Sequence, residues 1–126
     1  MINLKKITYI IILIFYFTKQ LLANTNYFNE GIKFYEKKEF KKAKFKFEQD
    51  IVFNPKSELS YLYLSKIYNK QDKKRLQETN LNTVILLNPK NEEAIYNLAR
   101  LKLKSSDYKK SKELNELLKS ICSKFC

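Results

Sequence analysis

The stretch IVFNPK at positions 51–56 returns as ILLNPK at positions 85–90, so Pro55 and Pro89 occupy the same place in two copies of one unit. They are the only prolines in the chain, and each closes an apolar run. Proline ends a helix because it lacks the N–H group that a helix interior needs, and the next helix is then free to start. The proline spacing matches the period of about 34 residues that is typical of repeated helix-turn-helix units. The sequence therefore predicts an all-α chain, an α-solenoid of about three antiparallel hairpins.

The same period extends beyond the two prolines. Small residues recur at one place in each unit, at Gly31, Ser65 and Ala99. A larger side chain there would overpack the two helices of a hairpin, at a cost of roughly 1–3 kcal/mol. We therefore expect one domain, residues 24–126, made of three repeats. The predicted repeats span residues 24–57, 58–91 and 92–125.

Each repeat is predicted to hold two helices joined by a short turn. In the first repeat, an apolar stripe with helical spacing marks the second helix; it consists of Phe40, Ala43, Phe47 and Ile51. Turns are expected at residues 37–39 and 105–107, where Ser106 or Asp107 would cap the last helix. That helix has one apolar side, formed by Leu114, Leu117, Leu118, Ile121 and Phe125. Either its own repeat covers this side or a second copy of the chain does, which leaves a homo-oligomer open.

This pattern resembles the tetratricopeptide repeat (TPR) across essentially all of residues 24–126. The first repeat carries the aromatic, small and proline positions of the family at Tyr27, Gly31, Phe34, Ala43, Phe47 and Pro55. The second repeat departs from the family with Gln77 in the place of an alanine. The third is more divergent, with Lys102, Ser111 and Asn115 at family positions.

The resemblance implies that partners bind to a concave face formed by the first helix of each hairpin. Counting around those helices predicts a groove lined by Phe28, Ile32, Tyr35, Leu62, Lys66, Asn69, Lys70, Tyr96, Asn97, Arg100 and Lys104. Four of these residues are cations from the second and third repeats, and the first repeat offers an apolar half. The predicted partner is a protein or peptide with acidic residues or a free carboxylate beside an apolar anchor. The alternative is that these lysines only form the solvated face of a lysine-rich protein.

The composition argues against catalysis. The chain has no His and only one Gly, so it lacks the commonest general base and cannot build a phosphate-cradling loop. Two Cys without His are too few for a structural zinc site. We therefore expect a non-catalytic protein with no cofactor and no metal. The net charge is +12, but only Arg75 and Arg100 are Arg, which weakens a nucleic-acid hypothesis because specific base contacts favour Arg.

Residues 1–23 have the features of a secretory signal peptide. Lys5 and Lys6 precede an apolar stretch at 7–17, and Leu21-Leu22-Ala23 offers a small residue at a cleavage site. The stretch is shorter than the roughly 20 residues that span a bilayer. We expect cleavage after Ala23 and an exported, periplasmic or secreted chain. The alternative is an uncleaved hydrophobic helix that anchors the chain in the inner membrane, and only then would the chain contact a membrane.

Cys122 and Cys126 are the only cysteines. At positions i and i+4 they could form a local disulfide in an oxidising compartment, pair between chains, stay free, or serve redox chemistry. Three functional hypotheses follow. The leading one is an adaptor of the cell envelope that binds a partner in the groove. The others are a membrane-anchored organiser lying on anionic lipid and a thiol-disulfide component.

Overall fold

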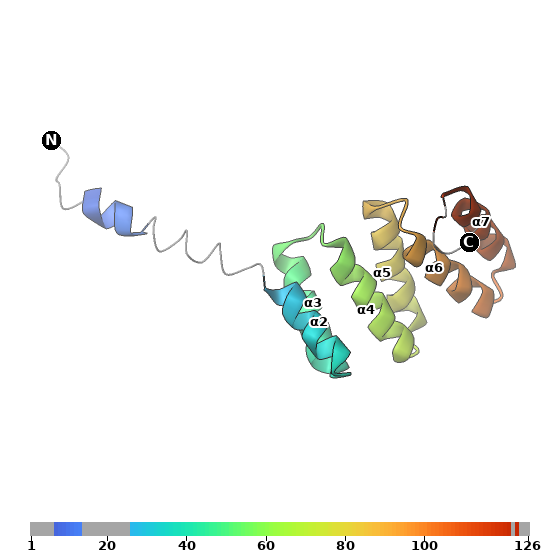
Figure 1. The fold of residues 1–126 in the computed structure, drawn as a ribbon, viewed down its shortest axis with the longest axis horizontal. Coiled ribbons are helices and arrows are strands. Elements are labelled where there is room, and N and C mark those ends of the chain that lie inside the picture. The colour runs from blue at the N-terminus through green and yellow to red at the C-terminus, as the bar shows by residue number, and fades with distance from the viewer. Residues whose placement is uncertain (1–6, 14–25, 122, 124–126) are drawn as a thin grey trace.

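The computed structural model describes residues 7–13, 26–121 and 123, and residues 7–13 are helical. Within 26–121 the chain forms three antiparallel hairpins, whose helices are α2 (Tyr27–Glu36) with α3 (Phe40–Phe53), α4 (Glu58–Lys70) with α5 (Lys74–Leu87), and α6 (Glu92–Lys104) with α7 (Tyr108–Ile121). Figure 1 shows the hairpins in one row, in the order of the chain. The described residues contain no strand. The prediction of an all-α stack of three hairpins is confirmed.

The helices keep the period of the sequence. The second helices of the three hairpins begin at Phe40, Lys74 and Tyr108, which follow one another at the same interval as the two prolines. The turns keep it too: each holds one residue in the left-handed region, with φ of 60° at Lys38, 52° at Asp72 and 61° at Ser106. None of these residues is Gly, although L-residues pay about 1–2 kcal/mol for this conformation.

The core consists of two clusters. The N-terminal cluster is rich in aromatic rings, and its buried members are Ala43, Phe47, Leu64, Ile67 and Tyr68. The C-terminal cluster is aliphatic, and its buried members are Leu62, Leu81, Val84, Ala94, Ile95, Leu98, Ala99, Leu101, Leu114 and Leu118. Helix α4 joins the two clusters, because Leu64 faces the first and Leu62 the second.

The predicted small positions are tightly enclosed. A Cβ atom added at Gly31 would lie only 2.5 Å from Cε1 of Phe47, whose side chain is fully buried. Ser65 and Ala99, at the same place in the next repeats, are also buried. The two residues that replace the family's alanine, Gln77 and Ser111, are buried as well. These two departures from the family pattern therefore fall inside the stack, whereas Lys102 is partly exposed and Asn115 is exposed.

Polar side chains form hydrogen bonds at the junctions between hairpins. The buried carboxylate of Asp50 accepts hydrogen bonds of 2.5 Å from the hydroxyl groups of Ser57 and Ser60. In the loop after α5, the Asn91 side chain accepts a hydrogen bond of 2.8 Å from the backbone N–H of Ala94 and so caps α6. Asp107 accepts one of 3.1 Å from the backbone N–H of Lys110, which identifies Asp107 as the cap of α7.

The last helix is covered mainly by its own hairpin. Leu114 and Leu118 are buried in the C-terminal cluster, whereas Leu117 is 40% exposed. Phe125 and the expected cleavage site after Ala23 lie outside the described residues. Among the described residues, no helix is long and apolar enough to cross a membrane.

Candidate functional site

Tyr63, on α4, lies at the centre of an aromatic contact between the first two hairpins. Its ring meets Phe28 and Tyr35 of α2 edge-on, with ring centroids 6.0 Å and 5.0 Å apart. It stacks on Phe47 of α3 at 5.2 Å. The first helices of the first two repeats are therefore held together by rings, and one hollow of the surface lies toward each end of this contact.

The first hollow, here called the apolar hollow, has a volume of about 470 Å³. Its apolar walls come from Phe28, Phe53 and Leu59, and its polar lining from Asp50, Asn54, Ser57 and Glu58. Phe53 is 54% exposed and Leu59 is 49% exposed, so both leave ring or aliphatic surface in water. A partner that covered these side chains would remove that surface from water, which favours binding.

The second hollow, here called the polar hollow, has a volume of about 320 Å³. It is lined by Tyr35, Ser65, Lys66, Asn69, Lys70, Gln77, Glu93 and Asn97. A smaller depression adjoins it and adds Arg100, Leu101 and Lys104. Both share Asn69, Gln77 and Asn97, so three carboxamides lie among the cations.

The charges of the polar hollow are partly balanced. Lys66 forms an ion pair of 2.7 Å with Glu93 of α6 and lies over the Tyr63 ring, 4.7 Å from its centroid. Lys70 and Arg100 lie over aromatic rings instead, and no described carboxylate pairs with either of them or with Lys104. The hollow is therefore cationic despite Glu93.

The same surroundings change the pKa of the Tyr35 hydroxyl group. Burial raises the pKa of this phenol above its ordinary value, and the nearby Lys66 cation lowers it to a smaller extent. Tyr35 therefore stays neutral at physiological pH, as a ring with a polar tip at the edge of the polar hollow.

The structure brings most of the predicted groove residues together. Those that line the polar hollow or its adjoining depression are Tyr35, Lys66, Asn69, Lys70, Asn97, Arg100 and Lys104. Phe28 lines the apolar hollow, Ile32 packs on the N-terminal cluster, and Tyr96 packs on the C-terminal cluster. The role of these residues in binding stays a prediction.

One predicted groove residue is misplaced. Leu62 is only 4% exposed and belongs to the C-terminal cluster, so the prediction that it lines the groove is wrong. The next residue, Tyr63, takes that place because α4 turns Leu62 toward α5 and α6. Cys122 and Cys126 lie outside the described residues, so the predicted thiol chemistry stays a prediction.

The sequence reasoning also missed Phe53, Leu59, Gln77 and Glu93 as residues of the two hollows, and Tyr63 as the ring that contacts Phe28 and Tyr35 between them. Periodicity could have found one of them. Tyr63 occupies the place in the second repeat that Asn97, a predicted groove residue, occupies in the third. Leu59 and Glu93 also share one place in their repeats, but neither was predicted, so the period gave no signal for them. Phe53 carried no comparable signal, since it ends an outer helix.

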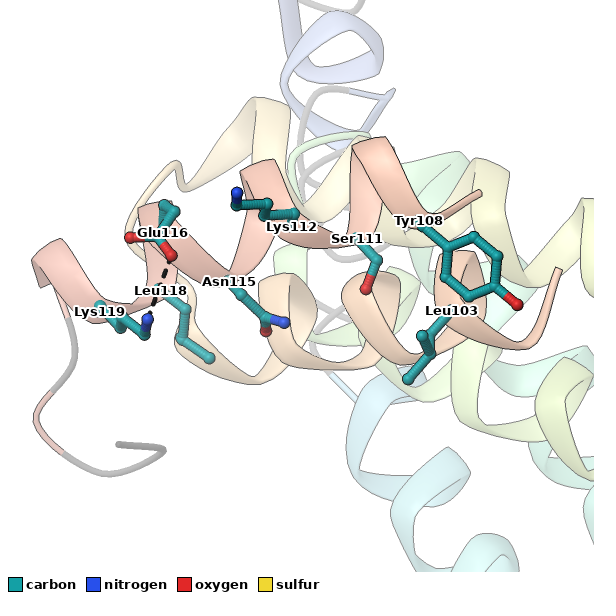
Figure 2. Close-up of a pocket in the computed structure, with 8 residues that line it drawn as sticks. All are labelled: Leu103, Tyr108, Ser111, Lys112, Asn115, Glu116, Leu118 and Lys119. Carbon is teal, nitrogen blue, oxygen red and sulfur yellow. Dashed lines mark hydrogen bonds and ion pairs between the residues drawn. The ribbon is translucent and has the colours of Figure 1, made fainter. Parts of the chain in front are cut away.

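A third hollow, of about 400 Å³, lies along α7. Figure 2 shows Leu103 and Tyr108 near one end and a series of polar side chains along the helix, where Lys119 donates a hydrogen bond of 3.1 Å to Glu116. Its lining comes from the last hairpin alone. The polar hollow, in contrast, draws side chains from α2, α4, α5 and α6, and is the better candidate for a binding site.

No protein-family model matches the sequence, and no curated protein matches it either. Solved structures do match. A structure of MamA is 21% identical, with a TM-score of 0.72 over 82% of this chain and 63% of that one. The CopN–Scc3 complex is 15% identical, with a TM-score of 0.69 over 75% of this chain and 56% of the other. This chain thus spans less than two thirds of each of those two.

A further match is the second TPR of Spaghetti (RPAP3), bound to the HSP90 peptide SRMEEVD. It is 15% identical to this chain, with a TM-score of 0.72, and the match covers 82% of this chain and 99% of that domain. The three hairpins, the repeat period and these likenesses agree, and the chain has the tetratricopeptide-repeat fold.

Proposed function

We propose that this protein is a non-catalytic adaptor that binds a peptide segment of another protein along α2, α4 and α6. One observation carries the proposal: an apolar hollow and a cationic polar hollow both take side chains from α2 and α4, and the Tyr63 ring contact lies between them. A peptide with an apolar anchor and a nearby acidic group would match both. The RPAP3 domain, which has the same fold, is described with a bound peptide.

The two hollows would contribute differently to affinity. Exposed charge pairs are worth roughly 0.2–1 kcal/mol each, so the lysines alone cannot hold a partner tightly. Burying apolar surface contributes about 25 cal/mol per Å², which makes Phe53 and Leu59 the better source of affinity. The cations would then set the orientation of the peptide and the rate of association.

A random peptide library displayed to the purified full chain tests this proposal. The double variant Leu59→Glu with Lys70→Glu changes both hollows, at two exposed positions. A matched control, Leu86→Glu with Lys74→Glu, makes the same chemical changes at exposed positions of α5. We expect the wild type and the control to enrich the same peptides and the groove variant to lose them. Equal binding by all three chains would contradict the proposal.

We also propose that the adaptor works in the cell envelope after export. The basic start, the apolar stretch and the small residue at Ala23 support this. The anchored alternative keeps the same segment in the bilayer, with the basic domain against anionic lipid. Alkaline extraction of membranes separates the two: a shortened chain in the supernatant supports cleavage, and a full-length chain in the pellet supports the anchor.

Self-association is the alternative use of the last hairpin. Leu103, Tyr108 and Leu117 leave apolar surface exposed along α7 and the end of α6. Sedimentation equilibrium of the full chain and of a Leu117→Glu variant tests it. A dimer that dissociates in the variant would support self-association through α7, and a monomer in both would oppose it.

A further inference from the structure

Gln77 lines the polar hollow although it lies on the second helix of its hairpin, whereas the other lining residues lie on first helices. It lies on α5, a second helix, at the place where the TPR pattern has alanine, and its side chain is only 7% exposed. Yet Gln77 lines both the polar hollow and the adjoining depression, whose other walls come from first helices and their ends. Its longer side chain therefore passes between α4 and α6 to the groove surface.

The amide group of Gln77 is unpaired there. It makes no hydrogen bond to any residue that the structure describes. Although Gln77 as a whole is largely buried, its amide atoms keep accessible surface at the hollow, so water bonds them when no ligand is present. A ligand in the polar hollow would replace that water as the partner, because the hollow is where the amide is accessible.

The surrounding charges identify the chemistry of that ligand. Lys70, Arg100 and Lys104 lie near the shared carboxamides and form no ion pair with a described carboxylate. Lys66 forms its ion pair with Glu93. An anionic group that accepts hydrogen bonds fits this site, and in a peptide that group is a carboxylate. Cations nearby stabilise it, and an amide N–H bonds it without adding charge.

We propose that Gln77 is a specificity-determining residue, whose Nε2 group donates a hydrogen bond to a carboxylate of the bound peptide. The inference rests on the proposed function and deepens it. The carboxylate belongs either to an acidic side chain or to the C-terminus of the partner. Both sources share the same recognition chemistry, and the test distinguishes them.

The variant Gln77→Met removes the amide and keeps the length of the side chain. The matched control is Gln49→Met on α3, since Gln49 likewise makes no side-chain hydrogen bond to a described residue but lines neither groove hollow. The probes are peptides selected by the wild-type full chain. Each is synthesised with its carboxylates intact, with acidic side chains changed to amides, and with an amidated C-terminus.

For the wild type and for Gln49→Met, we expect loss of the recognised carboxylate to weaken binding about tenfold. For Gln77→Met, we expect that penalty to fall below about threefold, because the hydrogen bond is already absent. The amide form that shows the penalty identifies the source of the carboxylate. Thermal unfolding of each variant confirms that the fold is intact.

A penalty of the same size in Gln77→Met and the wild type would overturn the role of Gln77 while leaving the adaptor proposal standing. Peptides that bind with no carboxylate penalty in the wild type would overturn it as well. If the wild type selects no peptide, or the groove variant binds the selected peptides equally, both proposals fail together.

Discussion

The N-terminal cluster is packed with aromatic rings, whereas the C-terminal cluster is packed with aliphatic side chains. The rings of Phe28, Tyr35 and Tyr63 continue from the first cluster to the groove surface. In the second cluster, apolar residues stay inside and the surface above them carries Asn97, Arg100 and other polar groups. The same repeat register thus brings aromatic rings to the groove surface over the first cluster and polar, cationic groups to it over the second.

This difference shows that the fold sets where groove positions lie, and the local sequence sets what they bind. In a stacked array each hairpin contacts mainly its neighbours, so one end can change without the other. The two halves should therefore respond separately to mutation. The following experiments probe that separation.

The largest effect is expected from Phe47→Ala. Phe47 is fully buried and contacts both Gly31 and the Tyr63 ring, so its loss leaves a cavity that costs about 3–5 kcal/mol. Hydrogen exchange should show α2 and α3 losing protection first, with α6 and α7 retained. Leu98→Ala is the counterpart in the C-terminal cluster and should reverse the order. Uniform loss of protection in both variants would show that the stack unfolds as one unit.

A smaller loss is expected from Gly31→Ala. Overpacking against Phe47 costs about 1–3 kcal/mol. The higher helix propensity of alanine stabilises α2 by up to about 1 kcal/mol relative to glycine. Because the Phe47 ring is itself enclosed, we expect a net loss of about 1 kcal/mol in denaturant unfolding. Ser65→Ala, at the same place in the second repeat, should stay within about 0.5 kcal/mol. Greater stability in Gly31→Ala would mean that the ring can move aside.

Alkaline pH should weaken both halves, each through its own groups. Burial raises the pKa of Tyr35 and of Tyr68, so the folded chain favours neutral phenols. Their contribution is complete below the unfolded pKa of about 10 and is lost as the pH rises through the folded values. In the other half, a hydrogen bond to Glu78 raises the pKa of Lys102, and that contribution is lost in the same direction.

Unfolding curves measured between neutral and alkaline pH test this assignment. Tyr35→Phe with Tyr68→Phe should flatten the alkaline loss of protection in α2 and α3. Lys102→Met should flatten the alkaline loss of protection in α5 and α6. The assignment fails if each variant changes the pH dependence of the opposite half instead.

The smallest effect on stability is expected from Glu93→Gln. Its ion pair with Lys66 is partly exposed, so the change should cost less than about 1 kcal/mol. Binding should respond more, because freeing Lys66 makes the polar hollow more cationic. We expect tighter binding of acidic peptides, with a steeper salt dependence in fluorescence titrations. Unchanged affinity would show that Lys66 lies outside the contact.

Much of the fold could be predicted from the sequence, since the proline spacing and the small residues report directly on helix ends and close packing. The site was harder. Counting around a helix placed Lys66, Asn69 and Asn97 in the groove, but it could not decide between the neighbours Leu62 and Tyr63, whose directions differ by about a quarter turn or more. Glu93 and Gln77 depend on contacts between hairpins, which no local pattern encodes.

The left-handed residues Lys38, Asp72 and Ser106 have a practical consequence for engineering. All three lie in turns between helices and line none of the hollows described above. Glycine adopts this backbone geometry without steric penalty, so each replacement should relax its turn by up to about 1 kcal/mol. Because each turn belongs to a different hairpin and no hydrogen bond or ion pair joins one of these residues to another, the gains should add. A triple glycine variant would then tolerate destabilising groove substitutions that the natural chain cannot.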